Sequence, residues 1–147
     1  MKNQIIIQET NFDLARKKIR ENQGKIIIFS GTDELNRKIL EKEKIDILLL
    51  NQKARRDKQR QRDSGFNQVL AKIAKKNNVA IGINLDEIIN AKTKTKAEVL
   101  ARIRQNIKLC NKNKLKMKFI PQTYRDIYDL KALSLILGMP TYMSKNL

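Results

Sequence analysis

The sequence predicts an α/β fold built on a parallel sheet, and two observations lead to this prediction. Short apolar runs alternate along the chain with stretches that have the period of an amphipathic helix. The middle runs, "KIIIFS", "IDILLL" and "VAIGIN", are continuously apolar, which is typical of strands covered by helices on a parallel sheet. Repeated strand–helix units form either an open doubly wound sheet or an incomplete (β/α) barrel, and periodicity alone leaves both open.

Strands and helices are expected to alternate through a single domain, residues 1–147, because 147 residues suffice for one core but not for two. Starting with a strand, the expected elements cover residues 4–9, 12–22, 25–30, 33–43, 45–50, 65–76, 79–84, 96–111, 115–121 and 124–137. Asn11, Thr32 and either Asp63 or Ser64 are the expected helix caps, since their side chains can accept a bond from an unpaired backbone N–H. Phe66 and Val69 are expected on the inner face of the helix at 65–76.

The charge is concentrated in one part of the chain. The formal net charge is +17, and residues 53–118 carry 19 basic and only five acidic side chains. Within them, "KARRDKQRQR" (residues 53–62, the basic loop) has six basic residues in ten and directly follows the third predicted strand. Such an excess predicts a polyanionic partner, most commonly nucleic acid. In both candidate architectures ligands bind at the carboxyl ends of the strands, so the loop opens from the functional edge.

Arginine-rich surface suits phosphate recognition, because the planar guanidinium makes paired, charge-assisted hydrogen bonds. The candidate RNA contacts are the basic residues of the loop, Lys53, Arg55, Arg56, Lys58, Arg60 and Arg62, and three at non-core positions of the helix at 96–111, Arg102, Arg104 and Lys108. Arg37 is a further candidate. No aromatic residue interleaves the loop, so recognition of the shape and backbone of structured RNA is favoured over base stacking. An ordinary solvated loop is the plain alternative.

Few enzyme chemistries are compatible with this composition. The chain has no histidine, and its single cysteine, Cys110, falls in step with Val99, Ile103 and Ile107 and is expected in the core. No phosphate-binding glycine motif is present. We therefore expect no catalytic residue, no metal site and no cofactor in the protein. One cysteine and the lack of a membrane-length apolar run favour a cytoplasmic protein with no membrane association.

The segment Asp63–Leu85, "DSGFNQVLAKIAKKNNVAIGINL", resembles the ribonuclease P protein component 3 family of archaea and eukaryotes. In that family a Ser-Gly-Leu-Asn helix start leads to an Ala-Lys-Leu-Ala helix and an apolar strand that ends in Asn. "SGTDELNRKILEKEKIDIL", with its Asn36-Arg37 pair, and "DLKALSLILGMP" are similar to further segments of the same family. The resemblance covers roughly residues 25–139.

The resemblance implies a (β/α) barrel, here reduced because the chain is short for the family. It also implies an RNA-binding subunit of ribonuclease P, the ribonucleoprotein endonuclease that removes the 5′ leader from precursor tRNA. The RNA performs that hydrolysis and is expected to need Mg²⁺. The implied partners are ribonuclease P RNA, precursor tRNA through the holoenzyme, and ribonuclease P protein component 2. A divergent phosphoesterase or nuclease on a truncated barrel and a basic protein-interaction module remain the alternatives.

Overall fold

A computed structural model describes residues 3–121 and 125–147 of the chain. Five parallel strands form one sheet in the order in which they occur along the chain. The strands are β1 (Gln4–Gln8), β2 (Ile26–Ser30), β3 (Ile47–Leu50), β4 (Ala80–Asn84) and β5 (Met117–Ile120). The predicted α/β fold with a parallel sheet is therefore confirmed. Tyr124, where the last helix was expected to begin, lies outside the described residues.

The helices are α1 (Phe12–Glu21), α2 (Asp33–Lys42), α3 (Gln68–Lys76), α4 (Leu85–Asn90), α5 (Thr93–Lys112), α6 (Ile127–Ile136) and α7 (Thr141–Lys145). The predicted caps Asn11 and Thr32 are confirmed, since each side chain accepts from backbone N–H groups in the first turn of its helix. Two short helices were not predicted. α4 follows β4 without a break, with Asn84 ending the strand and capping the helix, and α7 begins directly after Pro140.

The predicted start of α3 is wrong. The cap is Asn67, whose side chain accepts from the Leu70 N–H 3.0 Å away, and neither Asp63 nor Ser64 caps the helix. Ser64 is buried and its hydroxyl instead donates to Asn106 on α5 at 2.6 Å. Val69, expected on the inner face, is 53% exposed. The later start shifts the buried stripe so that Leu70, Ala71 and Ala74 face the core.

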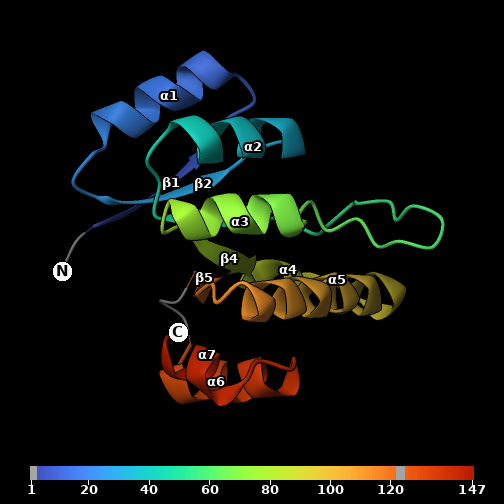
Figure 1. Cartoon of the computed structure of the whole chain (residues 1–147). Coiled ribbons are helices and arrows are strands. Elements are labelled where there is room, and N and C mark those ends of the chain that lie inside the picture. The colour runs from blue at the N-terminus through green and yellow to red at the C-terminus, as the bar shows by residue number, and fades with distance from the viewer. Residues whose placement is uncertain (1–2, 122–124) are drawn as a thin grey trace.

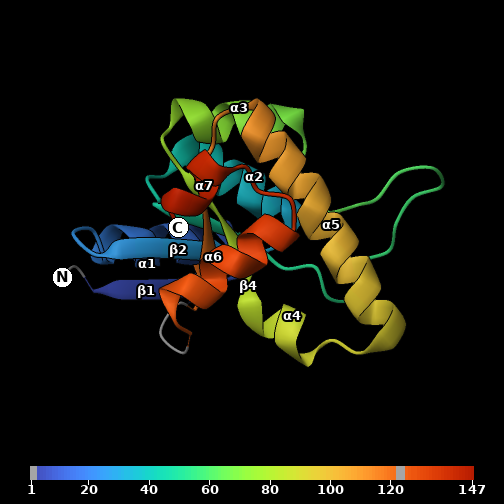
Figure 2. The same cartoon turned by 90° about the horizontal axis from the view of Figure 1, so that it is seen from below.

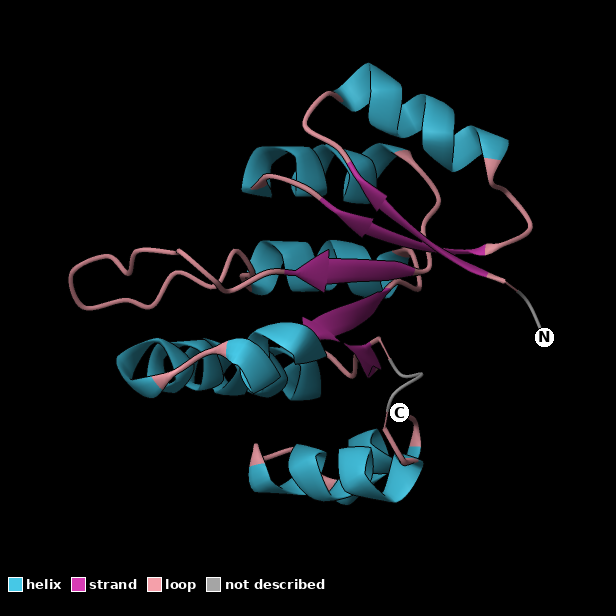
Figure 3. Ribbon diagram, turned by 180° about the vertical axis from the view of Figure 1, so that it is seen from behind, coloured by secondary structure: helices cyan, strands magenta, loops and turns pink. Residues whose placement is uncertain are grey.

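The helices cover one face of the sheet. Seen from behind, the strands lie in front of α2 and α3 (Figure 3), whereas the opposite view has these helices in front (Figure 1). Alternate strand residues such as Leu48 and Leu50 belong to the large core cluster that includes helix residues. Their neighbours Ile47 and Leu49 form a separate cluster with Ile28 and Ile120 and no helix residue.

Sequential strand order and helices on one face define an arc of a (β/α) barrel. A doubly wound sheet would reverse its order at a switch point and carry helices on both faces. The fold is thus a reduced, TIM-like barrel, and the carboxyl ends of its strands meet along one edge. In the described part of the chain, no helix combines the length and apolar character needed to cross a bilayer.

Candidate nucleic-acid interface

The edge at the carboxyl ends of the strands is closed by a chain of polar side chains. Asn51 donates from Nδ2 to the Ser30 hydroxyl at 2.9 Å, and Asn84 donates to Asn51 Oδ1 at 2.9 Å. These three side chains follow or end neighbouring strands, which is why parallel packing brings them together. These hydrogen bonds connect the ends of β2, β3 and β4 at the point where the basic loop leaves β3. Gln122, which follows the strand predicted at residues 115–121, lies outside the described residues.

The basic loop projects from the body of the domain, beside α5 (Figures 1 and 2). Its tip is a tight turn in which Lys58 and Gln61 pair as an antiparallel bridge, and Arg60 has a φ of 69°. Five of its six basic side chains belong to exposed residues: Lys53, Arg56, Lys58, Arg60 and Arg62. Within residues 3–121 and 125–147, none of these five makes an ion pair. They are therefore free to contact an anion in solution.

Arg55 is the loop's exception, because its side chain turns inward and is only 16% exposed. Its guanidinium binds the Asp33 carboxylate through two hydrogen bonds of 3.0 and 2.8 Å, and its Nε donates to the Asn51 carbonyl at 2.6 Å. Burial alone would lower the pKa of Arg55, but the hydrogen bonds and charge of Asp33 outweigh it and raise the pKa above its ordinary value. Arg55 therefore anchors the loop to α2.

Arg102 was expected at a non-core position of its helix, and that expectation is wrong. Its side chain is 3% exposed and points from α5 into the base of the loop. Nε donates to Asp57 at 3.0 Å, Nη1 to the Gln52 carbonyl at 3.1 Å and Nη2 to the Arg55 carbonyl at 3.0 Å. With its donors used on the loop and its surface buried, Arg102 is not placed to bind RNA.

Asp57, the partner of Arg102, is held as a carboxylate. It accepts the backbone N–H of Asp63 at 2.9 Å as well as the Arg102 guanidinium. These two hydrogen bonds, in that order of importance, lower the pKa of Asp57 below its ordinary value. The bond to Asp63 ties the returning strand of the loop to its outgoing strand.

Buried and half-buried polar groups form hydrogen bonds at both ends of the loop. The Glu87 carboxylate on α4 accepts the backbone N–H groups of Gln52 and Lys53 at 2.7 and 3.2 Å, where the loop begins. Where the loop ends, the Gln52 amide donates to the Ser64 carbonyl at 3.0 Å, and the Ser64 hydroxyl bonds to Asn106. Since buried polar groups are costly unless paired, this network favours one arrangement of the loop base.

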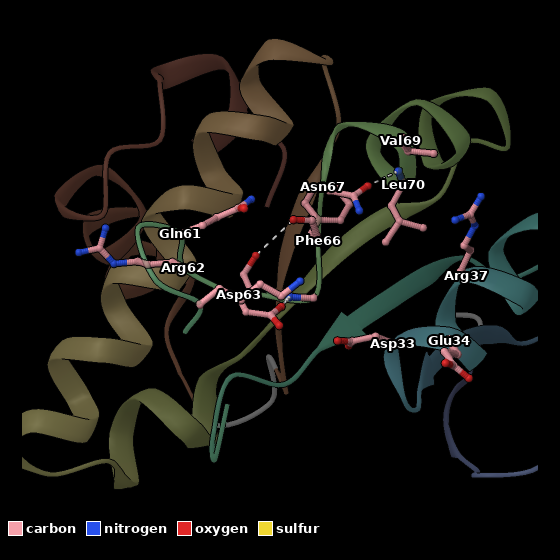
Figure 4. Close-up of a pocket in the computed structure, with 13 residues that line it drawn as sticks. Asp33, Glu34, Arg37, Gln61, Arg62, Asp63, Phe66, Asn67, Val69 and Leu70 are labelled. Carbon is pink, nitrogen blue, oxygen red and sulfur yellow. Dashed lines mark hydrogen bonds between the residues drawn. The ribbon is translucent and has the colours of Figure 1, made fainter. Parts of the chain in front are cut away.

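Arg37 lies with the loop at a pocket of about 330 Å³ between α2, the loop and the start of α3 (Figure 4). Lys58 and Arg62 contribute from the loop, while Asp33 and Glu34 line the same pocket from α2. Arg37 is exposed and pairs with Glu41 one turn along its helix at 3.0 Å. The mixed charge makes this pocket less suited to a bare phosphate than the loop tip.

Arg104 and Lys108 lie on the exposed side of α5, as expected. Together with Arg62 they line a second groove of about 670 Å³ whose floor includes Leu100 and Leu137. Arg62 lines both hollows, so the basic surface continues from the loop tip onto α5. Of the ten candidate contacts, eight belong to exposed residues, and Arg55 and Arg102 do not.

No cluster of three His, Cys, Asp or Glu side chains that could hold a metal occurs among residues 3–121 and 125–147. Cys110 is buried in the core, which confirms the expectation from its helical spacing. Burial raises the pKa of the Cys110 thiol to about 12, so it is not a reactive nucleophile.

The chain is similar in sequence to several archaeal proteins that bear the same name. The chain is 36% identical over 95 residues to ribonuclease P protein component 3 of Methanosarcina acetivorans, covering 65% of this chain and 37% of that protein. It is 32% identical over 124 residues to the component 3 of Methanococcus vannielii, covering 84% and 51%. No family model matches the chain.

The fold agrees with this likeness. A chain in the cryo-EM structure of archaeal ribonuclease P with mature tRNA superposes with a TM-score of 0.78 and 27% identity, over 97% of this chain and 62% of that one. This chain is related to ribonuclease P protein component 3. The resemblance read in the sequence is confirmed. The chain spans about half or less of the length of these curated relatives.

The segment Asp63–Leu85, on which the resemblance in the sequence was based, contributes residues to the pocket beside the loop. It supplies Gly65, whose φ of +73° turns the chain beneath the Arg55–Asp33 pair, then the Asn67 cap, α3 and β4. Sequence reasoning missed the residues that hold the loop: Asp33, Gln52, Asp57, Ser64, Glu87 and Asn106. Two signals were available. Asp57 is the only acidic residue in the basic loop, and Arg102 and Asn106 share the helical face of Val99, Ile103 and Cys110.

Proposed function

We propose that this chain is an RNA-binding protein subunit of ribonuclease P, supporting the catalytic RNA in removal of the 5′ leader from precursor tRNA. The observation that carries the proposal is the projecting basic loop with its five exposed basic side chains, bonded at its base to a fold similar to that of a chain in archaeal ribonuclease P. The formal charge of this protein is +17. When its basic side chains neutralise phosphates of a nucleic acid, the counterions condensed on that nucleic acid are released, and this release favours binding. The loop concentrates part of that charge on one surface.

The contacts are proposed to be with phosphates of folded RNA rather than with unstacked bases. Lys58, Arg60 and Arg62 extend from the tip, and Arg104 and Lys108 continue the surface along α5. The loop contains no aromatic side chain on which a base could stack. Guanidinium groups instead suit paired bonds to phosphate oxygens.

The remaining parts of the proposal concern the holoenzyme. Precursor tRNA is the proposed substrate through the holoenzyme, and ribonuclease P protein component 2 is the proposed protein partner. The protein is proposed to be non-catalytic and to carry no cofactor of its own, with Mg²⁺ serving the RNA. A cytoplasmic location is part of the same proposal.

Reconstitution tests the proposal. An archaeal ribonuclease P RNA transcript and its component 2 are combined with or without this chain, and cleavage of a 5′-extended precursor tRNA is followed in Mg²⁺. The chain should increase cleavage at limiting Mg²⁺ and should cleave nothing without the RNA. Unchanged cleavage together with no binding to the transcript would refute the proposal. RNA-independent phosphodiesterase activity would instead favour the divergent enzyme.

A further inference from the structure

An acidic residue in the middle of the basic loop is unexpected in a surface that binds a polyanion. Asp57 is the only carboxylate among residues 53–62, and its side chain is about one-third exposed. A negative charge at this position repels phosphate, and its removal would raise the net charge of the loop by one. The structure gives Asp57 another role, because its Oδ1 accepts two hydrogen bonds within the loop base.

Arg102 is the complementary group. It reaches the loop from α5, 45 residues away in the sequence, and bonds to Asp57 and to the carbonyls of Gln52 and Arg55. Asp57 in turn holds the N–H of Asp63 on the returning strand. One buried guanidinium and one carboxylate thereby connect both strands of the loop to the long helix.

We propose that Asp57 and Arg102 are positioning residues that increase RNA affinity without touching RNA. They hold the loop in one shape, so that the exposed basic side chains are already arranged before RNA arrives. A loop released from this pair would have to be ordered on binding, and the lost entropy would weaken the complex. The proposal rests on the RNA-binding function above and adds that a carboxylate in the loop favours binding of a polyanion.

The direction in which Asp57→Ala changes RNA affinity distinguishes a positioning role from an effect of total charge. Asp57→Ala makes the protein more positive, so bulk electrostatics predicts equal or tighter RNA binding. Loss of positioning predicts weaker binding, by about fivefold or more if one charge-assisted hydrogen bond is lost. Arg102→Gln changes the charge in the opposite direction and should weaken binding as well. Because the two residues share the Asp57–Arg102 contact, the affinity lost in the double variant should be smaller than the sum of the two single losses.

Asp86→Ala is the matched control. Asp86 lies on α4 at the same edge of the fold, is exposed, and lines a small pocket together with Lys53. The substitution Asp86→Ala removes the same charge near the same loop as Asp57→Ala does. The Asp86 side chain, however, makes no hydrogen bond or ion pair among the described residues. Its RNA affinity should be unchanged or slightly higher.

The experiment uses the full chain and an archaeal ribonuclease P RNA transcript, with affinity measured by fluorescence anisotropy at fixed salt. Thermal unfolding monitors the global fold, and hydrogen exchange monitors the backbone amides of the loop. We expect Asp57→Ala to keep its fold, exchange faster in the loop and bind more weakly than Asp86→Ala. If Asp57→Ala binds as tightly as the control or tighter, the inference is overturned. Additive losses in the double variant would also overturn it.

Asp57→Ala decides the question even if Arg102→Gln fails to fold, because Asp57 is partly exposed and fills no core position. Failure of the proposed function has a different signature. In that case the unaltered protein does not bind the transcript at all, and this inference falls with it.

Discussion

The guanidinium of Arg55 faces the carboxylate of Asp33 so that two parallel hydrogen bonds form, Nη1 to Oδ2 at 3.0 Å and Nη2 to Oδ1 at 2.8 Å. This pair joins the basic loop to the first turn of α2, 22 residues earlier in the chain. Asp33 lies in the first turn of α2, where its negative charge is favourable to the helix dipole. Its carboxylate also holds the Arg55 guanidinium inward, so that Arg55 is less exposed than the other basic residues of the loop.

Gly65→Ala should disrupt this pair. Gly65 has a φ of +73°, and a β-carbon there would lie 2.4 Å from Nη2 of Arg55 and 2.7 Å from Oδ1 of Asp33. The left-handed backbone alone costs an L-residue about 1–2 kcal/mol, and displacing the ion pair adds to this. We expect the free energy of unfolding to fall by roughly 2 kcal/mol or more in urea denaturation.

Gly24→Ala separates the two contributions to that loss. Gly24 also has a positive φ, +97°, but a β-carbon there would meet nothing within 4 Å. It should therefore show the backbone cost alone. Equal losses in the two variants would mean that Arg55 and Asp33 move aside without cost.

Replacement of Arg56, Arg60 and Arg62 with alanine should weaken RNA binding and leave the fold nearly intact. All three belong to exposed residues, and such substitutions usually shift stability by about 0.5 kcal/mol or less each. Each lost phosphate contact should reduce the log–log salt dependence of the binding constant by about 0.7–0.9. Arg55 is left in place because it is an anchor.

The control for charge alone is Lys17, Lys72 and Lys76 to alanine, on α1 and α3. These residues are exposed and away from the loop, whereas Lys18 and Arg20 pair with Glu9 and Glu43 and would confound the comparison. Affinity and salt dependence are measured for both triple variants by titration at several salt concentrations. Equal losses would make binding a matter of total charge and the loop an ordinary solvated one.

Cys110 should be unreactive in the folded protein. Burial raises the pKa of its thiol to about 12, so almost no thiolate exists at pH 8, and the core shields the sulfur. Reaction of Cys110 with a thiol reagent should be slow in buffer. In denaturant it should be fast, at the rate of a model thiol under the same conditions. Cys110→Ala should cost about 1 kcal/mol and leave RNA affinity unchanged. Rapid labelling of the native protein would contradict the buried placement.

Acid should release the loop at a pH below the ordinary titration of aspartate. The pKa of Asp57 is lowered in the folded protein, so its contribution to stability is present above the unfolded value of about 4 and is lost as pH falls through the folded value. The Asp57 carboxyl carbon, followed by NMR, should titrate with a midpoint below about 4. A midpoint at or above that value would argue against the bonds to Asp63 and Arg102.

The sequence by itself determined the class of fold and the distribution of charge. Continuously apolar strands between amphipathic helices predict a parallel sheet covered by helices, because strands that alternate between core and water would have a polar residue at every second position. The caps Asn11 and Thr32 and the buried Cys110 follow from local spacing, and each prediction is confirmed. The position of the basic loop after β3 also follows from the order of elements.

Only the tertiary structure decided how the sheet is wound and which basic residues face outward. Strand order is a relation between distant segments, so periodicity could not separate the barrel arc from a doubly wound sheet. Arg55 and Arg102 resemble their neighbours in sequence, but Asp33 and Asp57 draw them inward from 22 and 45 residues away. Ser64 was expected to cap α3, but its hydroxyl donates to Asn106 on α5 instead, and Asn67 is the residue that caps α3. A local pattern records a side chain's charge and period, whereas its partner is set by the packing of the folded chain.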